Sequence, residues 1–319
     1  MKLAPIGLSV YSRIDHVKQT VQALQNNKLA SESTLYIFSD APQPGDELKV
    51  KEVRNFIKTT EGFRNISIIE RTENSRVNNN RNGIRSLLDK HGKMIFLEED
   101  IVTAPKFLEF MNQALNFYRG DQRIISINGY TPPIKPPAYY KKDIYLSLRF
   151  CAWGFGIWKD RYDKIKMNIE GYKTFLKDKV ALKRFRMGGE DLPYLLKSEA
   201  ERLIDALDVK IMFHQFQKNL YTVAPLVSLV QNIGHDGTGV HCRKTDKFNT
   251  TLDTGDKQLI MEKDIQLNLD IIKCLYAFRS GGIKGKIERL LKRTYLLPAA
   301  KLIFKQPIRL LLKTKNSFT

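Results

Sequence analysis

Three adjacent acidic residues, Glu98-Glu99-Asp100, are the strongest candidates for chemistry in this chain. They follow the apolar run 93–97, which has the composition of a buried strand, so they lie at that strand's carboxyl end. Adjacent carboxylates repel one another, and Mg²⁺ or Mn²⁺ is held by one or two carboxylates together with substrate phosphate oxygens. The triplet therefore predicts a divalent-cation site for a phosphorylated substrate, with a solvated acidic loop as the alternative.

The elements that must position this triplet are predicted by the apolar patterns of the first 130 residues. Short β-branched runs predict strands at 6–11, 34–39, 66–70, 94–97 and 124–127. Apolar residues at helical spacing predict helices between them, the first capped by Asp15, the third ending at Gly92 and the fourth starting after Pro105. This alternation predicts an α/β fold with a mostly parallel sheet, helices on both faces, and ligand-binding loops along one edge.

The second half of the chain has a weaker pattern. Prolines follow Gly129, an aromatic-rich segment covers 139–158, and the helical pattern is weak over 205–268. A glycine-containing linker at 280–282 leads into a basic C-terminal segment. We therefore expect one domain at 1–280 and a separate tail at 281–319.

Composition limits the class of protein. The 319 residues are 42% hydrophobic and 10% aromatic, which predicts a globular chain. Three widely spaced cysteines, Cys151, Cys242 and Cys274, form no C-x-x-C pair and favour a reducing cytoplasm. We expect no signal peptide and no transmembrane helix. The net charge of +19 calls for an anionic partner: nucleic acid, a phospholipid surface or a phosphorylated substrate.

Several motifs stand at the predicted strand ends, in the order first strand, second strand, then the segment before the acidic triplet. They are the first-strand pattern 6–13 (IGLSVYSR), Ser39-Asp40, and the segment 78–83 (NNNRNG). With Glu98-Glu99-Asp100 they resemble the GT-A glycosyltransferases, especially the bacterial surface-polysaccharide transferases of glycosyltransferase family 2 and N-acetylglucosaminyltransferase I. The resemblance covers most of residues 5–245. A departure from the family's D-x-D motif is Glu98, where that motif has Asp.

This resemblance implies an inverting, metal-dependent glycosyltransferase with a GT-A (Rossmann-like) fold and a nucleotide-sugar donor, namely a UDP-sugar. It places nucleotide binding in residues 1–130 and acceptor binding in 131–280. Asp100 would hold Mn²⁺ or Mg²⁺, Glu99 would lie near the ribose and Glu98 would face the donor sugar. The further donor contacts it implies are Arg13 at the base or phosphates, Asp40 at the uracil ring, and Ser9, Tyr11 and Arg81.

The same resemblance implies an acceptor side and a catalytic base. Direct transfer needs a carboxylate that takes the acceptor's proton, and Asp191 is the first candidate, with Glu190 second. The alternative is that Asp191 caps the helix that follows it. The acceptor-side residues are Trp153, Gly154 and Phe155; packing in the core is the alternative for Trp153 and Trp158, and Trp158 is the better core candidate. A late loop, 232–241, would close over the diphosphate, with His241 preferred over His235 as a metal ligand.

The basic tail predicts a membrane contact. From Lys284 onwards there are ten Lys or Arg against one acid, interleaved with leucines and broken by Pro298 and Pro307. This composition is typical of helices that lie on anionic lipid, and a helix packed on the catalytic domain is the alternative. We therefore expect a cytoplasmic protein that is peripheral on the inner face of the cytoplasmic membrane, acting on a glycan or lipid-linked glycan acceptor of a capsule, O-antigen or lipopolysaccharide.

Two other functions are compatible with part of the sequence. A sugar-nucleotide nucleotidyltransferase shares the α/β start and the acidic metal site, but needs a glycine-rich basic loop after the first strand, where residues 11–15 read YSRID. A non-enzymatic nucleic-acid-binding protein would spread its charge over one face with interleaved aromatics. Because almost half of the excess charge lies in the leucine-rich tail, we expect no nucleic-acid partner.

Overall fold

The first half of the chain alternates strands with helices, as the apolar patterns predict. The structure is a computed structural model that describes residues 2–239 and 244–281. The elements of this half are β1 (Ile6–Val10), α1 (Ile14–Gln25), β2 (Thr34–Ser39), α2 (Glu47–Lys58), β3 (Asn65–Glu70), α3 (Arg76–His91), β4 (Lys93–Glu98), β5 (Ile101–Thr103), α4 (Phe107–Phe117) and β6 (Ile124–Asn128). All five predicted strands are confirmed, each to within one residue at either end.

The second half contains more regular structure than its sequence pattern predicts. Its elements are β7 (Ile144–Ser147), β8 (Phe155–Trp158), α5 (Lys159–Tyr162), α6 (Tyr172–Lys177), α7 (Lys179–Arg186), α8 (Leu192–Ala200), α9 (Leu207–Gln217), β9 (Tyr221–Pro225), β10 (Val230–Asn232) and α10 (Leu269–Ser280). The weak helical pattern over 205–268 conceals α9. Residues Val209 to Gln215 of that helix are all buried, so it has no polar face to produce a helical period.

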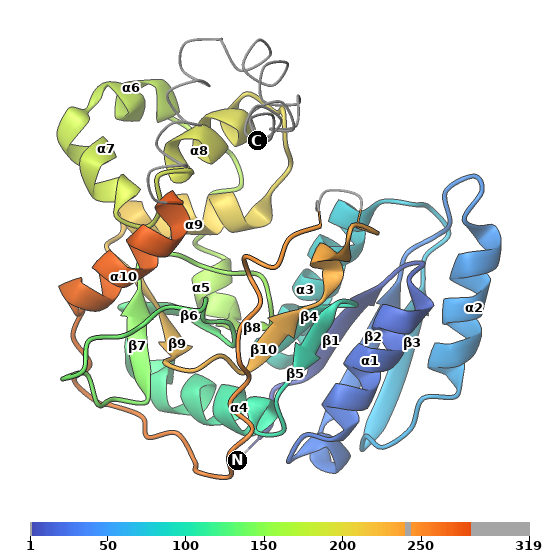
Figure 1. Ribbon diagram of the computed structural model, residues 1–319. Helices are drawn as coiled ribbons and strands as arrows, with labels where there is room; N and C mark the ends of the chain where they lie inside the picture. The colour runs from blue at the N-terminus through green and yellow to red at the C-terminus, as the bar shows by residue number, and fades with distance from the viewer. Residues whose placement is uncertain (1, 240–243, 282–319) are drawn as a thin grey trace, which may run out of the picture.

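Eight strands form the main sheet, in the order β3-β2-β1-β4-β8-β6-β9-β7. Pairing along β3, β2, β1 and β4 is parallel, while β8 is antiparallel to both β4 and β6, and β7 is antiparallel to β9. The remaining pair, β6 and β9, is parallel. Only β7 and β8 therefore run against the other strands of this sheet, so the carboxyl ends of β1, β2, β4 and β6 share one edge (Figure 1).

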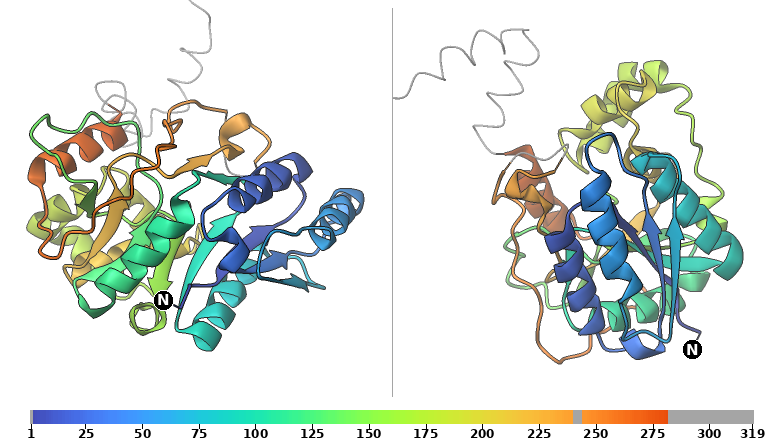
Figure 2. Two further views of the ribbon diagram at one scale, coloured as in Figure 1. Left: turned by 90° about the horizontal axis from the view of Figure 1, so that it is seen from below. Right: turned by 90° about the vertical axis from the view of Figure 1, so that its right-hand side faces the viewer.

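Helices cover both faces of the sheet. Apolar residues of α1, α2 and α4 form one core layer with β1 and β2, and residues of α3, α8 and α9 form the other with β4 and β8. Seen along the sheet, α1 and α2 lie on one side and α3 on the other (Figure 2, right). The predicted α/β fold class with a mostly parallel sheet is confirmed, and the predicted tail lies outside the described residues.

Two helix-end predictions have different outcomes. Gly92 ends α3 in the left-handed conformation, with φ 76°, as predicted. The predicted Asp15 cap is wrong, because α1 already starts at Ile14, and Arg13, two residues before Asp15, occupies the cap position. Asp15 lies in the first turn, where a negative charge is favourable at the positive end of the helix dipole.

A second, two-stranded sheet carries a loop onto the acidic triplet. β10 pairs with β5 antiparallel, with Val230 opposite Thr103 and Asn232 opposite Ile101. β5 starts directly after Asp100, so the residues that follow β10 are brought over the carboxyl end of β4. The backbone N–H of Ile233 donates to the carbonyl of Asp100 at 2.9 Å, which fixes the contact.

No helix within 2–239 and 244–281 is long and apolar enough to span a bilayer.

Candidate active site

A cleft of about 1010 Å³ opens at the carboxyl ends of β1, β2 and β4. Eight of the residues predicted from the sequence line it: Ser9, Tyr11, Arg13, Asp40, Glu98, Glu99, Asp100 and Trp153. The loop after β10 closes one side with Asn232, Gly234 and Asp236. Ligands bind at this edge in open α/β sheets, because the strand ends and their loops converge there.

A smaller chamber of about 240 Å³ adjoins this cleft. Arg76, Glu98 and Trp153 line both spaces, so the two cavities meet at the end of β4. Apolar side chains of Phe96, Phe150 and Phe155 form part of the chamber, and Arg81 and Asp208 lie on its wall. A ligand with two parts could therefore occupy both spaces at once.

The three acidic side chains do not converge on one point. Glu98 is the last residue of β4, and its carboxylate accepts from the Asn80 amide at 2.7 Å. Glu99 accepts from the backbone N–H of Tyr11 at 2.6 Å. Arg13 joins the other two, with Nε at 2.7 Å from Glu99 and Nη2 at 2.7 Å from Asp100. Within the described residues, no three His, Cys, Asp or Glu side chains group as a metal-ligand set.

Arg13 compensates the negative charge of Glu99 and Asp100. Burial raises the pKa of Glu99, and the nearby Arg13 opposes this rise. Burial lowers the pKa of Arg13, but Asp100 and Glu99 outweigh that effect and bring it above its ordinary value. The guanidinium is therefore a permanent cation beside the acidic pair.

One acceptor and one donor are left without partners at this ion pair. Asp100 Oδ1 and Arg13 Nη1 are buried and make no hydrogen bond to the described residues. Gly234 packs directly above them: a Cβ at that position would lie 2.1 Å from Asp100 Oδ2 and 3.0 Å from Arg13 Nη1. Unpaired buried polar atoms are costly, so this pair of atoms is suited to an incoming ligand.

Glu98 lies where the cleft and the chamber meet. Burial raises its pKa, the nearby Asp100 adds to the rise, and Arg76 and the Asn80 amide oppose it. A carboxyl group in this setting can accept hydrogen bonds, and when protonated it can also donate one.

Asp40 orders the start of α3. It is 2% exposed, and its carboxylate accepts from the backbone N–H of Ser75 at 3.0 and 3.1 Å. Ser75 in turn caps α3 by accepting from the N–H of Asn78. One turn on, the Asn79 amide donates to Ser9 at 3.0 Å and so ties α3 to β1. Asp40 thus lines the cleft and also holds its wall.

Tyr11 and Arg81, two other predicted donor contacts, lie in different places. Tyr11 lines the cleft, and its hydroxyl donates to Asp46 at 2.9 Å. Arg81 lines only the smaller chamber, where it pairs with Asp205. The structure therefore groups Tyr11 with all three acids, whereas Arg81 shares a cavity with Glu98 alone.

Asp208 is a candidate that the sequence reasoning missed. It lies in the first turn of α9 and lines the chamber that Glu98 also lines. Burial raises its pKa, although Arg149 opposes the rise. The only signal for Asp208 in the sequence is that it is an acid at the start of an apolar run. Because α9 is buried on all sides, its sequence shows no helical alternation of apolar and polar residues.

Glu190 and Asp191, the two candidates for the catalytic base, line neither cavity. Arg149 binds the Asp191 carboxylate through two hydrogen bonds of 2.8 Å. Burial raises the pKa of Asp191, but Arg149 outweighs it, so the net shift is downward. Glu190 accepts from the hydroxyl of Tyr276. The alternative role, a helix cap, holds only for position. Asp191 occupies the cap position of α8, but its side chain makes no capping hydrogen bond.

The predicted acceptor residues divide between cavity and core. Trp153 faces both cavities and packs edge-on against Tyr130 and His235. Phe155 is 3% exposed and touches the chamber from the core. Gly154 packs inward: a Cβ there would lie 3.0 Å from Val230 and 3.2 Å from Phe107. Trp158 is a core residue, as expected, with its indole N–H donating to the Leu115 carbonyl at 3.0 Å.

Of the two histidines in the late loop, the structure describes only His235. His241 lies outside the described residues. His235 packs edge-on against Trp153 and at a tilt against Phe248, and burial lowers its pKa although Asp100 opposes this. A neutral imidazole at neutral pH can serve as a ligand or as a hydrogen-bond partner.

Comparison with known proteins gives weak likenesses. No family model matches the sequence, and no curated protein sequence matches it. TarS from S. aureus matches with 8% identity and TM-score 0.34, over 51% of this chain and 30% of TarS. The fragment TarS 1–349 in complex with UDP matches with 8% identity and TM-score 0.38, over 71% of this chain and 59% of that one.

A third likeness is to the mannosyltransferase PcManGT from Pyrobaculum calidifontis, in complex with GDP-Man and Mn²⁺. It has 9% identity and TM-score 0.37, over 68% of this chain and 70% of that chain. The two matches to TarS each cover less than two thirds of the TarS chain in question. Likenesses of this size carry no inference about activity, which depends on the residues of the site.

Proposed function

We propose that this protein is a metal-dependent glycosyltransferase that uses a nucleotide sugar, specifically a UDP-sugar. The observation that carries the proposal is the pair of adjoining cavities at the carboxyl edge of the sheet. The larger holds Arg13, Asp40 and Asp100, and the smaller holds an acid, Asp208, with a raised pKa. A nucleotide sugar has two parts of different chemistry, and these cavities offer a matching division.

The nucleoside and its diphosphate would occupy the larger cleft. Its lining contains more carboxylates than cationic side chains among the described residues, so a diphosphate needs an additional cation. Arg13 Nη1 is a free donor for a phosphate oxygen, and Asp40 and Tyr11 line the part of the cleft assigned to the base. The bare backbone of Gly234 permits the close approach of the loop over the phosphates.

The free oxygen of Asp100 fits a divalent cation. Mg²⁺ and Mn²⁺ prefer oxygen ligands, and Mg²⁺ sites of this kind use one or two carboxylates with the rest supplied by phosphate and water. Asp100 Oδ1 would hold the ion, with His241 as a second proposed ligand. When bound, the ion would stabilise the negative charge that develops on the leaving diphosphate. This chain's own contribution there is to orient Asp100 through Arg13 Nη2, at 2.7 Å.

The donor sugar would occupy the smaller chamber. Glu98 lies at its entrance and can bind sugar hydroxyls, while Trp153 offers an aromatic face to the apolar side of a pyranose. Arg76 lies at the same entrance and balances the charge of Glu98. Glu99, with its carboxylate bound to Tyr11 N–H and Arg13, would lie near the ribose.

We assign the catalytic base to Asp208 and keep Asp191 as the competing candidate. An inverting displacement needs a carboxylate that accepts the acceptor's proton as the new bond forms. Asp208 lines the chamber assigned to the sugar, whereas Asp191 is bound at both oxygens by Arg149 outside it. The raised pKa makes Asp208 the stronger base of the two.

The acceptor proposal rests on the composition of the tail. A leucine-rich segment with ten basic residues after Lys284 favours attachment to the inner face of the cytoplasmic membrane. The acceptor would then be a lipid-linked glycan of a capsule, O-antigen or lipopolysaccharide.

The test is a panel of nucleotide sugars with Mn²⁺, scored for release of nucleoside diphosphate. We expect release with at least one UDP-sugar, its abolition by chelation, and its loss in Asp100→Ala. Asp208→Asn should lose turnover at unchanged donor affinity, while Asp191→Asn should keep it. Pyrophosphate release would instead identify a nucleotidyltransferase, and full activity of Asp100→Ala would refute the metal assignment.

A further inference from the structure

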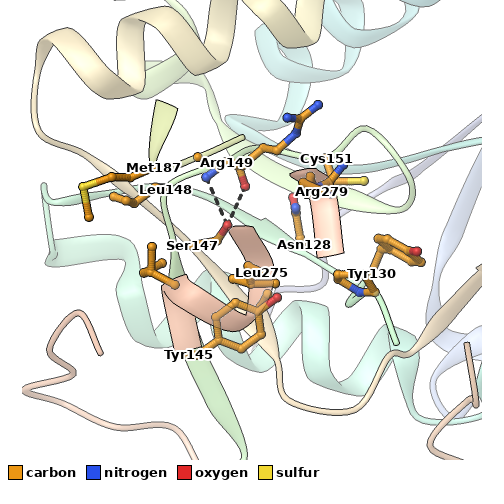
Figure 3. Close-up of a pocket in the computed structure, with 14 residues that line it drawn as sticks. Asn128, Tyr130, Tyr145, Ser147, Leu148, Arg149, Cys151, Met187, Leu275 and Arg279 are labelled. Carbon is orange, nitrogen blue, oxygen red and sulfur yellow. Dashed lines mark hydrogen bonds between the residues drawn. The ribbon is translucent and has the colours of Figure 1, made fainter. Parts of the chain in front are cut away.

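A small pocket on the far side of the segment 147–153 contains two arginines and no acidic residue. It has about 20 Å³ of free space, and its lining includes Asn128, Tyr130, Ser147, Arg149, Cys151 and Arg279 (Figure 3). A space of this size holds little more than one water molecule, so an anionic group would place only one or two of its oxygens inside it. Arg149 and Cys151 face this pocket, while the alternate residues Phe150 and Ala152 face the chamber assigned to the donor sugar. The segment 149–152 therefore separates the two sites.

The neutral polar groups of the pocket are already paired. The Asn128 amide bonds both backbone groups of Cys151, at 2.9 and 3.0 Å. Ser147 donates to the Arg149 carbonyl at 2.8 Å and accepts from its N–H at 3.0 Å, as the dashed lines in Figure 3 mark. The Tyr130 hydroxyl donates to the Phe248 carbonyl at 3.0 Å. Each of these groups therefore has a partner within the protein, and none of them bonds to an arginine side chain.

The positive charge of the pocket is only partly compensated. Asp191 takes the guanidinium of Arg149, with both hydrogen bonds at 2.8 Å. Arg279, near the end of α10, makes no hydrogen bond or ion pair with any residue that the structure describes. Burial and the like charge of Arg149 lower the pKa of Arg279 to about 10, so it still carries its charge at neutral pH. Of the two guanidinium groups, only that of Arg149 is paired with a carboxylate among the described residues.

We propose that this pocket binds one anionic group, a carboxylate or a phosphate, through Arg279. An unpaired guanidinium presents its donors in a planar fork that matches such oxyanions. Binding would remove the repulsion between Arg149 and Arg279 and supply the missing negative charge. The inference does not depend on the proposed transferase activity, because it concerns a pocket separate from the donor cavities. The group could come from a free ion or from a charged glycan.

The experiment measures the thermal midpoint of the full chain at constant ionic strength while sodium phosphate, or sodium glucuronate in parallel, replaces sodium chloride. We expect at least one of the two anions to raise the wild-type Tm by about 3 °C at the highest concentration used, since ligands that bind only the native state stabilise it. Arg279→Met should abolish that rise. Arg64→Met, which removes an exposed arginine elsewhere, should keep it and so controls for net charge.

Two further outcomes make the test decisive. Arg279→Lys retains the charge but lacks the fork, so its rise should be smaller than that of wild type; it also replaces Arg279→Met if that variant does not fold. The anion that produces the same rise at the lower concentration identifies the ligand class. An equal rise in Arg279→Met and wild type, or no rise in wild type with either anion, would overturn the proposal.

Discussion

Asp208 combines a place on the chamber wall with burial that raises its pKa. A general base works only when deprotonated, so a raised pKa moves the acid limb of the rate profile to higher pH. We expect kcat to fall as pH is lowered through a value above the ordinary range for an aspartate. Asp208→Asn should lose about 10²–10⁴-fold in kcat, the usual contribution of a general base.

The measurement is the pH dependence of kcat for wild type and Asp191→Asn, beside the residual rate of Asp208→Asn. An Asp191→Asn variant should keep the wild-type acid limb, because Arg149 lowers the pKa of Asp191 and holds it outside the chamber. Loss of that limb in Asp191→Asn would transfer the base to Asp191.

Gly234 is the second position where a single residue has a specific consequence. A methyl group there would meet Asp100 Oδ2 at 2.1 Å, closer than non-bonded atoms approach, and the obstacle is a carboxylate held by Arg13. We expect Gly234→Ala to displace the loop after β10 and to weaken donor binding at least tenfold. Isothermal titration with the nucleoside diphosphate and Mn²⁺ measures this effect, and Gly120→Ala, where a Cβ would meet no atom within 4 Å, indicates what a glycine substitution costs without such a contact.

At the scale of elements, α1, α4 and β5 are joined by one side chain. Asn27 donates to the carbonyl of Ala23 and to Thr103 Oγ1, both at 2.8 Å, and accepts from the N–H of Leu108 at 2.9 Å. Its neighbour Asn26 accepts one exposed hydrogen bond from Gln22. Asn27→Ala should therefore lower the free energy of unfolding by about 1–3 kcal/mol, because it leaves buried groups unpaired.

Asn26→Ala is the matched control and should change stability by less than about 0.5 kcal/mol. Urea unfolding followed by circular dichroism compares the two variants. Equal stability losses would show that the Asn27 contacts do not hold these elements together. Because Asn27 lies outside both cavities, nucleotide binding at 25 °C should be unchanged in either variant.

The strands and helices also differ in how far the sequence predicts them. Strands such as β1 and β4 are short apolar runs that end in polar residues, so their existence and the position of the acidic triplet follow from pattern alone. The chamber could not be foreseen, because α9 is buried on every side and carries no periodic polar face. The pairing of Arg13 with Glu99 and Asp100 joins residues 86 and 87 positions apart, and no local pattern encodes such contacts.

The position of the late loop, 232–241, is likewise not predictable from local sequence pattern. Its glycines are visible in the sequence, but its position over Asp100 depends on the pairing of β10 with β5. That pairing is a tertiary contact between segments more than a hundred residues apart. The family resemblance predicts Asp191 as the base, but Asp191 lines neither cavity and is bound by Arg149 instead.

For the whole molecule, the charge distribution predicts how it meets a membrane. The segment after Lys284 supplies nine of the nineteen net positive charges. Deleting residues 284–319 should abolish sedimentation with vesicles that contain anionic lipid and leave nucleoside-diphosphate release with a water-soluble acceptor unchanged. Vesicles of neutral lipid serve as the control, since they should bind neither form.

Unchanged vesicle binding after the deletion would contradict the membrane assignment of the tail. Loss of both vesicle binding and soluble activity would instead place the tail against the catalytic domain, which is the alternative reading of its composition. Far-ultraviolet circular dichroism of the shortened chain distinguishes that second outcome from a failure to fold.

The ion pair of Arg13 with Glu99 and Asp100 has a practical consequence for handling the protein. Since a resident side chain already compensates these acids, stripping the metal with a chelator should leave the thermal midpoint of the ligand-free protein nearly unchanged. Protein purified in chelating buffer should then recover activity on addition of Mn²⁺, without refolding. A fall in the midpoint on chelation would show that the ion, rather than Arg13, holds these carboxylates together. The metal-free protein could thus be stored in an inactive, folded form and activated by adding Mn²⁺.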